Sequence, residues 1–124
     1  GFTIFMKNYI KQTDPFIVPT ADDKLIEEHF GNASLKYEGC SVCRCEVPPR
    51  WKEPYQNPEF DEVVLVSKGK LEVKIDKENV IIEKGESILL KKGGRIRFKN
   101  PFDEPAEFYS VCLPPFSLKT VHRE

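Results

Sequence analysis

The side chains that could perform chemistry in this 124-residue chain are few, and histidine is the scarcest of them. The only two histidines are His29 and His122, far apart in the sequence, so a metal site of three clustered histidines is impossible within one chain. His122 lies in the tail TVHRE and could act as an acid or base there, because the pKa of histidine is near neutrality. The alternative for His122 is an exposed or packing role.

Glu62 is the main candidate for a catalytic acid or base. In an extended segment it shares a face with Val64 and Val66, so its surroundings are expected to be apolar. Burial in such surroundings raises the pKa of a carboxyl group and allows proton exchange near neutral pH. The alternative is a structural carboxyl group held by hydrogen bonds.

The proline-rich segment PPRWKEPYQNPEF precedes Glu62 and cannot be helical. Gln56 could hold a polar ligand through its amide, which both donates and accepts hydrogen bonds. Trp51 and Tyr55 could stack on the same ligand, because loops on a rigid scaffold often carry binding residues. The alternatives are a solvent-exposed glutamine, and aromatic side chains that cover the core or form a dimer contact.

Cys40, Cys43 and Cys45 have metal-like spacing, and Cys112 is the fourth cysteine. A zinc or iron–sulfur site would need a turn that gathers the thiolates, and no glycine lies between the first three. An extended segment instead puts Cys43 and Cys45 on one face and Cys40 on the other. We expect reduced, buried cysteines without a metal. A redox role is an alternative that lacks the usual pattern of two cysteines before a helix.

Charge and hydropathy exclude several classes of partner. Lys plus Arg total 19 and Asp plus Glu total 20, a balance unlike that of a nucleic-acid-binding domain. No apolar run approaches the ~20 residues that span a bilayer, and the opening GFTIF lacks the features of a secretory signal. We expect a cytoplasmic protein without a nucleic-acid or membrane partner. Arg95, Arg97 and Lys99 share one strand face, which could bind phosphate or carboxylate but is better explained as a solvated outer face.

The elements that must position these residues are mostly strands. Residues 14–19 predict a short edge strand between prolines. Residues 20–31 predict a short helix that Thr20 caps and Gly31 ends, with an apolar stripe between them. His29, near the end of this helix, would interact favourably with the helix dipole.

The rest of the chain has the period-two pattern of strands. In the strand that begins at Glu62 both alternating sets are mostly apolar, which is typical of a strand covered on both sides. Turn pairs at Lys84-Gly85 and Gly93-Gly94 separate further short strands. This spacing predicts an antiparallel sandwich or small barrel in one domain over residues 1–124. The predicted strands include residues 35–47, 62–67, 71–75 and 106–113.

Two segments resemble the paired signatures of the cupin family. Glu62 and Gly69 take the glutamate and glycine positions of the first motif, within EFDEVVLVSKGKLEV. Three positions of the second motif, within GESILLKKGGRIRFKN, are also matched: Gly85, Gly93 and Asn100. The resemblance covers about residues 46–113. It implies an all-β fold, a small double-stranded β-helix (cupin or jelly-roll barrel), to which the predicted N-terminal helix is added.

The same resemblance shows that the metal ligands of the family are missing. The histidine positions hold other residues: Gln56 and Pro58 in the first motif (Tyr55 and Asn57 with a longer spacing) and Ile96 in the second. Only Glu62 of the four usual ligands is retained. One carboxylate with an amide is a poor site for a first-row transition metal, so we expect no metal and no cofactor.

Within the cupins, the chain is most similar to the small ethanolamine-utilisation protein Q-type group. The similarity includes the loop PPRWKEPYQNPEFDE, although Arg50 stands where a glycine is usual, and the ending AEFYSVCLPPFSLKTVHRE. That group is associated with acetate kinase-type activity. The chain has no glycine-rich phosphate loop that would support this activity directly.

The leading functional hypothesis is a cupin that binds a small polar or anionic metabolite in its barrel, with Glu62 and Gln56 as anchors and Trp51 and Tyr55 at the mouth. One alternative is a metal-independent isomerase, lyase or acetate kinase-like enzyme that uses Glu62, with or without His122. Another is a structural cupin in a metabolic assembly. An accessible Glu62 near a second titratable group favours the enzyme, whereas a Glu62 sealed within packed side chains counts against both the binding and the enzyme hypotheses and favours the structural role.

The resemblance also implies a homodimer. Two apolar segments near the N-terminus are consistent with this expectation, because either could cross to the sheet of a partner subunit. They are FTIF at residues 2–5 and PFIVP at residues 15–19.

Overall fold

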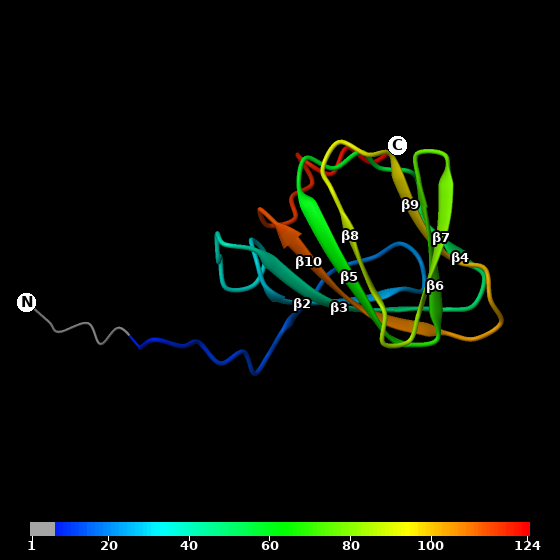
Figure 1. Cartoon of the computed structure of the whole chain (residues 1–124). Coiled ribbons are helices and arrows are strands. Elements are labelled where there is room, and N and C mark those ends of the chain that lie inside the picture. Colours follow the sequence, from blue (N-terminus) through cyan, green and yellow to red (C-terminus); the bar gives the residue numbers. More distant parts are fainter. Residues whose placement is uncertain (1–6) are drawn as a thin grey trace, which may run out of the picture.

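Two antiparallel β-sheets face each other across a shared apolar core (Figure 1). The computed structural model describes residues 7–124, so the segment FTIF lies outside the described residues. The six-stranded sheet has the order β1-β2-β3-β10-β5-β8, and the four-stranded sheet has the order β4-β9-β6-β7. The strands are β1 (Phe16–Ile17), β2 (Leu25–Phe30), β3 (Ser41–Val47), β4 (Trp51–Lys52), β5 (Asp61–Lys68), β6 (Lys70–Ile75), β7 (Glu78–Glu83), β8 (Ser87–Leu90), β9 (Ile96–Asn100) and β10 (Ala106–Leu113).

The predicted all-β architecture is confirmed, but the helix predicted over residues 20–31 is wrong. This segment contains β2, which pairs antiparallel with β3. The expected cap, Thr20, donates its hydroxyl to the carbonyls of Asp22 at 3.2 Å and Lys24 at 2.9 Å, whereas an N-cap side chain accepts from a backbone N–H. Over so short a segment, the spacing of the apolar residues fits a helix as well as a strand. Pairing with β3 decides in favour of the strand. Over residues 7–124, no helix is long and apolar enough to cross a membrane.

Other expectations about the N-terminal part have mixed outcomes. The predicted edge strand is present as β1, at the end of the six-stranded sheet. His29 lies in β2 and its carbonyl accepts a hydrogen bond from Gln12 Nε2 at 2.8 Å, so the expected interaction with a helix dipole does not exist. The strand predicted over residues 35–47 begins only at Ser41.

Strand register arranges the inward side chains of the six-stranded sheet into rows that run across the strands. One row is Cys45, Phe108 and Val66. The next row is Cys43, Ser110 and Val64. The third is Ser41, Cys112, Glu62 and Leu90. Polar groups therefore accumulate toward one end of the barrel interior.

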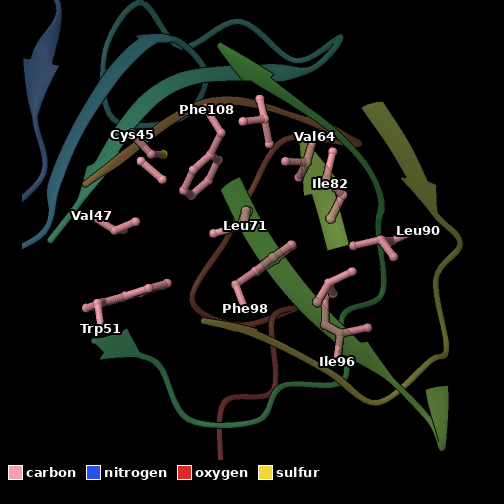
Figure 2. Packing of buried hydrophobic residues seen from close by; sticks show 13 residues of the cluster. Cys45, Val47, Trp51, Val64, Leu71, Ile82, Leu90, Ile96, Phe98 and Phe108 are labelled. Atoms are coloured by element: carbon pink, nitrogen blue, oxygen red, sulfur yellow. The ribbon is translucent and has the colours of Figure 1, made fainter. Parts of the chain in front are cut away.

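The rest of the interior is apolar (Figure 2). Leu71 and Val73 of β6 face Val64 and Val66 across the core, and none of these four is exposed to solvent. The rings of Phe98 and Phe108 stack at 6.2 Å between the two sheets. Burial of this apolar surface holds the sheets together.

The motif glycine Gly69 joins β5 to β6 in a turn that other residues fit poorly. Its φ is +70°, and a Cβ atom placed on it would lie 2.5 Å from the carbonyl oxygen of Pro105. Gly85 also has a positive φ, +86°, but a Cβ there would meet no atom within 4 Å. Both glycines adopt the left-handed conformation expected at the motif turns. Only at Gly69 would a side chain also collide with a neighbouring atom.

Gly69→Ala should destabilise the protein more than the matched variant Gly85→Ala. In each variant the alanine must adopt a left-handed backbone conformation, which lowers the free energy of unfolding by about 1–2 kcal/mol. Gly69→Ala should add at least about 1 kcal/mol, because the backbone near Pro105 must move. Urea unfolding of both variants measures the difference, and equal losses would contradict this account of the β5–β6 turn.

Candidate functional site

Six polar side chains, five of them buried and one half-buried, mark the polar end of the barrel as the candidate site. Four come from the six-stranded sheet and two from the segment that follows β4 and runs along β9. We call them the interior polar cluster: Cys43, Glu62, Ser110, Cys112, Glu53 and Gln56. Leu90 and Ile96, the strand partners of Glu62 and Gln56, lie toward the same end of the core (Figure 2).

Glu62 is the central acid of this cluster. Its side chain is directed inward beside the core, the residue is only 7% exposed, and Ser110 Oγ donates a hydrogen bond of 2.5 Å to its Oε2. Burial raises the pKa of Glu62 to about 7; the Ser110 hydrogen bond opposes this shift, the negative charge of Glu53 adds to it and Arg123 lessens it. Glu62 therefore exchanges its proton near neutral pH, as an acid or base must.

Glu53 is a second buried acid that the sequence patterns did not single out. Its Oε1 accepts a hydrogen bond of 3.3 Å from the backbone N–H of Phe98. Burial raises the pKa of Glu53, and the positive charges of Lys24 and Arg123 act in the opposite direction. Period-two alternation from the buried Trp51 would have placed Glu53 on the same inward face. The prolines of this segment interrupt any strand pattern, so the alternation could not be followed from the sequence.

Gln56 is held in place by its backbone but not by its side chain. It exchanges backbone hydrogen bonds with Ile96 at 2.9 and 2.8 Å, and the residue is only 4% exposed. Its Oε1 is buried without a hydrogen-bond partner. An unpaired buried polar atom costs about 1–3 kcal/mol and calls for an explanation, such as a binding role.

Burial favours the protonated form of the thiols of the cluster. Burial raises the pKa of Cys43 to about 12, with a further contribution from the charges of Glu28 and Glu62. Burial also raises the pKa values of Cys45 and Cys112. Cys43 and Cys45 share the inward face, as expected, and all four cysteines are free. Among residues 7–124, no group of three His, Cys, Asp or Glu side chains could hold a metal ion.

The C-terminal segment, residues 114–124, covers the polar end and is called the tail below. Phe116 and Val121 of the tail form a separate small apolar cluster with Phe60 and Cys112. The rings of Phe60 and Phe116 meet edge-on at 5.8 Å. Backbone hydrogen bonds attach the tail to residues 55–59, and Arg95 binds the carboxylate of Glu124 at 2.7 and 2.8 Å. The tail thus closes the barrel beside Glu62.

His122 does not join Glu62. It lies on the outer surface, where its Nε2 is 2.6 Å from Glu59 Oε2. It lines an open depression of about 530 Å³ together with Asn57, Pro58, Glu59, Lys92 and Gly93. Glu62 does not line this depression, so the structure separates the two residues that the sequence offered as acid–base partners.

Trp51 and Tyr55 also lie apart from the interior polar cluster. Trp51 packs into the core, and its Nε1–H donates a hydrogen bond of 2.9 Å to Asp22 Oδ2 (Figure 2). Tyr55 lies outside, with the Arg95 and Arg97 guanidinium groups 3.7 and 4.8 Å from its ring centre. These contacts engage both aromatic rings with residues outside the interior polar cluster.

Comparisons with known proteins agree on the fold. The family model for the cupin domain (Cupin_2) matches residues 43–112. Endoribonuclease YbeY of Myxococcus xanthus is 38% identical over 108 residues, which are 87% of this chain but only 37% of that protein. The chain therefore spans little more than a third of that curated relative.

Two solved structures show the same architecture at low sequence identity. The putative ethanolamine utilization protein Q from Salmonella typhimurium is 20% identical with a TM-score of 0.62, covering 73% of this chain and 69% of that one. The polyketide cyclase RemF from Streptomyces resistomycificus is 15% identical with a TM-score of 0.70, covering 87% and 80%. At such identities the likeness shows the fold alone.

Glu62→Gln should remove a pH dependence from the stability of the protein. Because the folded-state pKa of about 7 is above the ordinary value of 4.5, the native state holds this proton more tightly than the unfolded state. The contribution of Glu62 is fully present below pH 4.5 and is lost as the pH rises to about 7, a change of roughly 3 kcal/mol.

Urea unfolding of both proteins between these pH limits measures the effect. As the pH rises, the free energy of unfolding of the variant should increase relative to that of the natural protein. The pH dependence that comes from Glu53 should remain in both proteins. Parallel stability curves would show that Glu62 does not titrate in this range.

Proposed function

Because the chain belongs to the cupin family, we propose that it is a binding domain that holds a small uncharged polar molecule inside its barrel without a transition metal. The carrying observation is the interior polar cluster, in which Glu62 exchanges a proton near neutral pH and Gln56 Oε1 has no partner. A buried core that served only stability would gain from apolar residues at both positions. A ligand supplies the missing hydrogen bonds.

The charges of the cluster favour an uncharged ligand over an anionic one. Glu53 and Glu62 are both buried acids, and the raised pKa of each shows that its surroundings do not compensate a negative charge. An anion beside them would meet the same desolvation cost and their repulsion. A protonated Glu62 donates one hydrogen bond and accepts another, which suits a hydroxyl or amide group. The proposal is therefore for an uncharged polar ligand rather than an anionic one.

Access to the cluster requires movement of the tail. In the closed structure Glu62 and Gln56 are 7% and 4% exposed. The tail packs through its own small cluster around Phe60, which is separate from the main core. Opening the tail therefore breaks this cluster and a few surface hydrogen bonds, and leaves the sheets intact. Segments with so few buried contacts open more easily than the core.

The second candidate is a metal-independent enzyme that uses Glu62 as a proton donor and acceptor. The pKa near 7 favours this role, because an acid–base catalyst works best when its pKa lies near the working pH. His122 lies outside with Glu59, so this candidate relies on Glu62. Turnover of a bound molecule that Glu62→Gln abolishes would raise this candidate above simple binding.

The third candidate is a structural cupin, which the burial of Glu62 beneath the tail favours. The relatives suggest two further settings for this chain. The M. xanthus protein joins a segment like this one to further sequence, an arrangement that suits a binding domain serving a larger protein. An ethanolamine-utilisation role with acetate kinase-like activity rests on resemblance alone.

Gln56→Leu should abolish ligand binding without loss of stability. The matched variant Glu59→Gln, which alters the outer depression, should bind normally. The probes are two sets that differ in charge: glycerol, glycerate and glycerol phosphate, and glucose, gluconate and glucose phosphate. An uncharged ligand at ten times its Kd stabilises by about 1.4 kcal/mol, which raises the Tm by roughly 5 °C.

Thermal unfolding with each probe distinguishes the possibilities. The Tm should rise with an uncharged member and stay constant with its charged analogues. A shift that survives Gln56→Leu and disappears in Glu59→Gln would place binding in the outer depression. No shift with any probe, or shifts with the anions only, would contradict the proposal.

Val121→Ala should speed modification of the Cys112 thiol by iodoacetamide about tenfold. Val121 covers Cys112, and the loss of two methyl groups weakens the tail contact by roughly 1.6 kcal/mol. The control is Leu118→Ala, because Leu118 belongs to the same tail but is 80% exposed. Mass spectrometry of the Cys112 peptide measures the rate. Equal rates in the natural protein and both variants would show that the tail does not control access.

A further inference from the structure

The outer face of the four-stranded sheet carries a cluster of positive charge that is separate from the interior polar cluster. Its residues alternate along β6 and β9 with buried side chains of the core, so they point away from the barrel interior. Strand pairing brings lysines to the stripe that the sequence shows on β9, because Lys52 lies opposite Lys99 and Lys74 lies opposite Arg97. We call this set the basic face: Lys52, Lys74, Arg95, Arg97 and Lys99.

The positive charge of the basic face is only partly balanced by acids. Lys99 Nζ is 3.6 Å from Glu72 Oε2, and Arg95 binds the carboxylate of Glu124 at 2.7 and 2.8 Å. The other three residues form no ion pair within residues 7–124: Lys52, Lys74 and Arg97. The whole chain has 19 basic and 20 acidic residues, so this excess belongs to the face and not to the composition. An ordinary solvated face would carry the acids that are missing here.

Tyr55 shows the effect of this charge on a neighbouring group. The Arg95 and Arg97 guanidinium groups lie 3.7 and 4.8 Å from the centre of its ring. Desolvation acts to raise the pKa of Tyr55, but hydrogen bonds and positive charge from Arg97 and Lys74 outweigh it and lower the pKa. A lowered pKa of a phenol means that its surroundings favour negative charge. The basic face is therefore suited to an anionic partner.

We propose that the basic face binds an extended acidic peptide segment of a partner protein. Arg95, Arg97 and Lys99 are two residues apart along β9 and its approach, and alternate residues of an extended chain repeat every ~6.8 Å. A peptide with acidic residues at alternate positions has the same repeat, so its carboxylates meet successive cations. β9 lies between β4 and β6, which places Lys52 and Lys74 on either side of the peptide.

The tail already provides one contact of the proposed kind. Arg95 holds the carboxylate of Glu124 through its Nε and one terminal nitrogen, a two-point arrangement that suits a carboxylate. The next cation along the strand, Arg97, donates its Nε–H to the backbone carbonyl of Glu53 at 2.8 Å. Its remaining N–H groups are directed to the same outer face and are available to a second carboxylate.

Two other classes of anion fit the basic face less well. Proteins bind single-stranded nucleic acid by stacking its bases on open aromatic rings, whereas the ring of Tyr55 is covered by the Arg95 guanidinium. A small anion would contact only one or two of these cations, and each exposed ion pair contributes little by itself. Several contacts along one peptide add together. The proposal does not depend on ligand binding in the barrel, since these residues lie on its outside.

Fluorescence anisotropy with the full chain and labelled peptides tests the proposal. The probe is a peptide of alternating glutamate and threonine, and its neutral counterpart has glutamine in place of glutamate. The acidic peptide should bind, and its affinity should fall as NaCl is raised, because salt screens exposed charges. The neutral peptide should not bind. A peptide with the same glutamates arranged in adjacent pairs should bind at least about threefold more weakly, because alternate side chains of an extended chain point to opposite faces.

The double variant Lys52→Gln, Lys74→Gln should raise the Kd of the alternating acidic peptide about tenfold. The matched control is Lys84→Gln, Lys119→Gln, which removes the same charge from the β7–β8 turn and the tail. This control should leave the Kd unchanged. Circular dichroism verifies that both variants are folded.

Three results would overturn the proposal. The first is no binding of the alternating acidic peptide, or equal affinity for the two arrangements of glutamate. The second is an equal increase of Kd in the two double variants, which would indicate attraction by net charge without a site. The third is tighter binding of an oligouridylate of matched length, which would assign the basic face to nucleic acid.

Discussion

The pairing of β10 with both β3 and β5 is the constraint on which the rest of the structure depends. It sets Ser110 against Val64 and Cys112 against Glu62 inside the barrel, and Val111 against Val63 outside. Because side chains alternate with a period of two, a shift of one residue would exchange these faces. The single register therefore sets the apolar inner face of this sheet and four members of the interior polar cluster at the same time.

The surroundings of Glu62 and Glu53 determine the protonation of the interior polar cluster. A cupin with three histidines and a glutamate would hold a cation that keeps the carboxylate ionised. Here Ile96 stands at one histidine position and Gln56 at another, and Glu62 is instead buried with Glu53 nearby. The result is a carboxyl group with a pKa near 7 and an amide without a partner, which fits hydrogen bonding to an uncharged molecule better than metal chemistry.

The tail packs on the barrel as a unit separate from the main core. The tail covers the polar end through Phe116 and Val121, which pack on Phe60 apart from the main core. Opening the tail would therefore expose the interior polar cluster while leaving the two sheets in place.

The sequence alone determined most of the strands after residue 40, the motif glycines such as Gly69 and the loss of the metal-binding histidines, because period-two alternation, turn chemistry and residue identity are local. It also indicated that Glu62 faces inward. The tertiary structure decided that residues 25–30 form a strand, since their spacing fits either period until β3 pairs with them. It also decided that Glu53 joins Glu62, while His122 lies outside with Glu59, because only chain folding sets which distant residues meet.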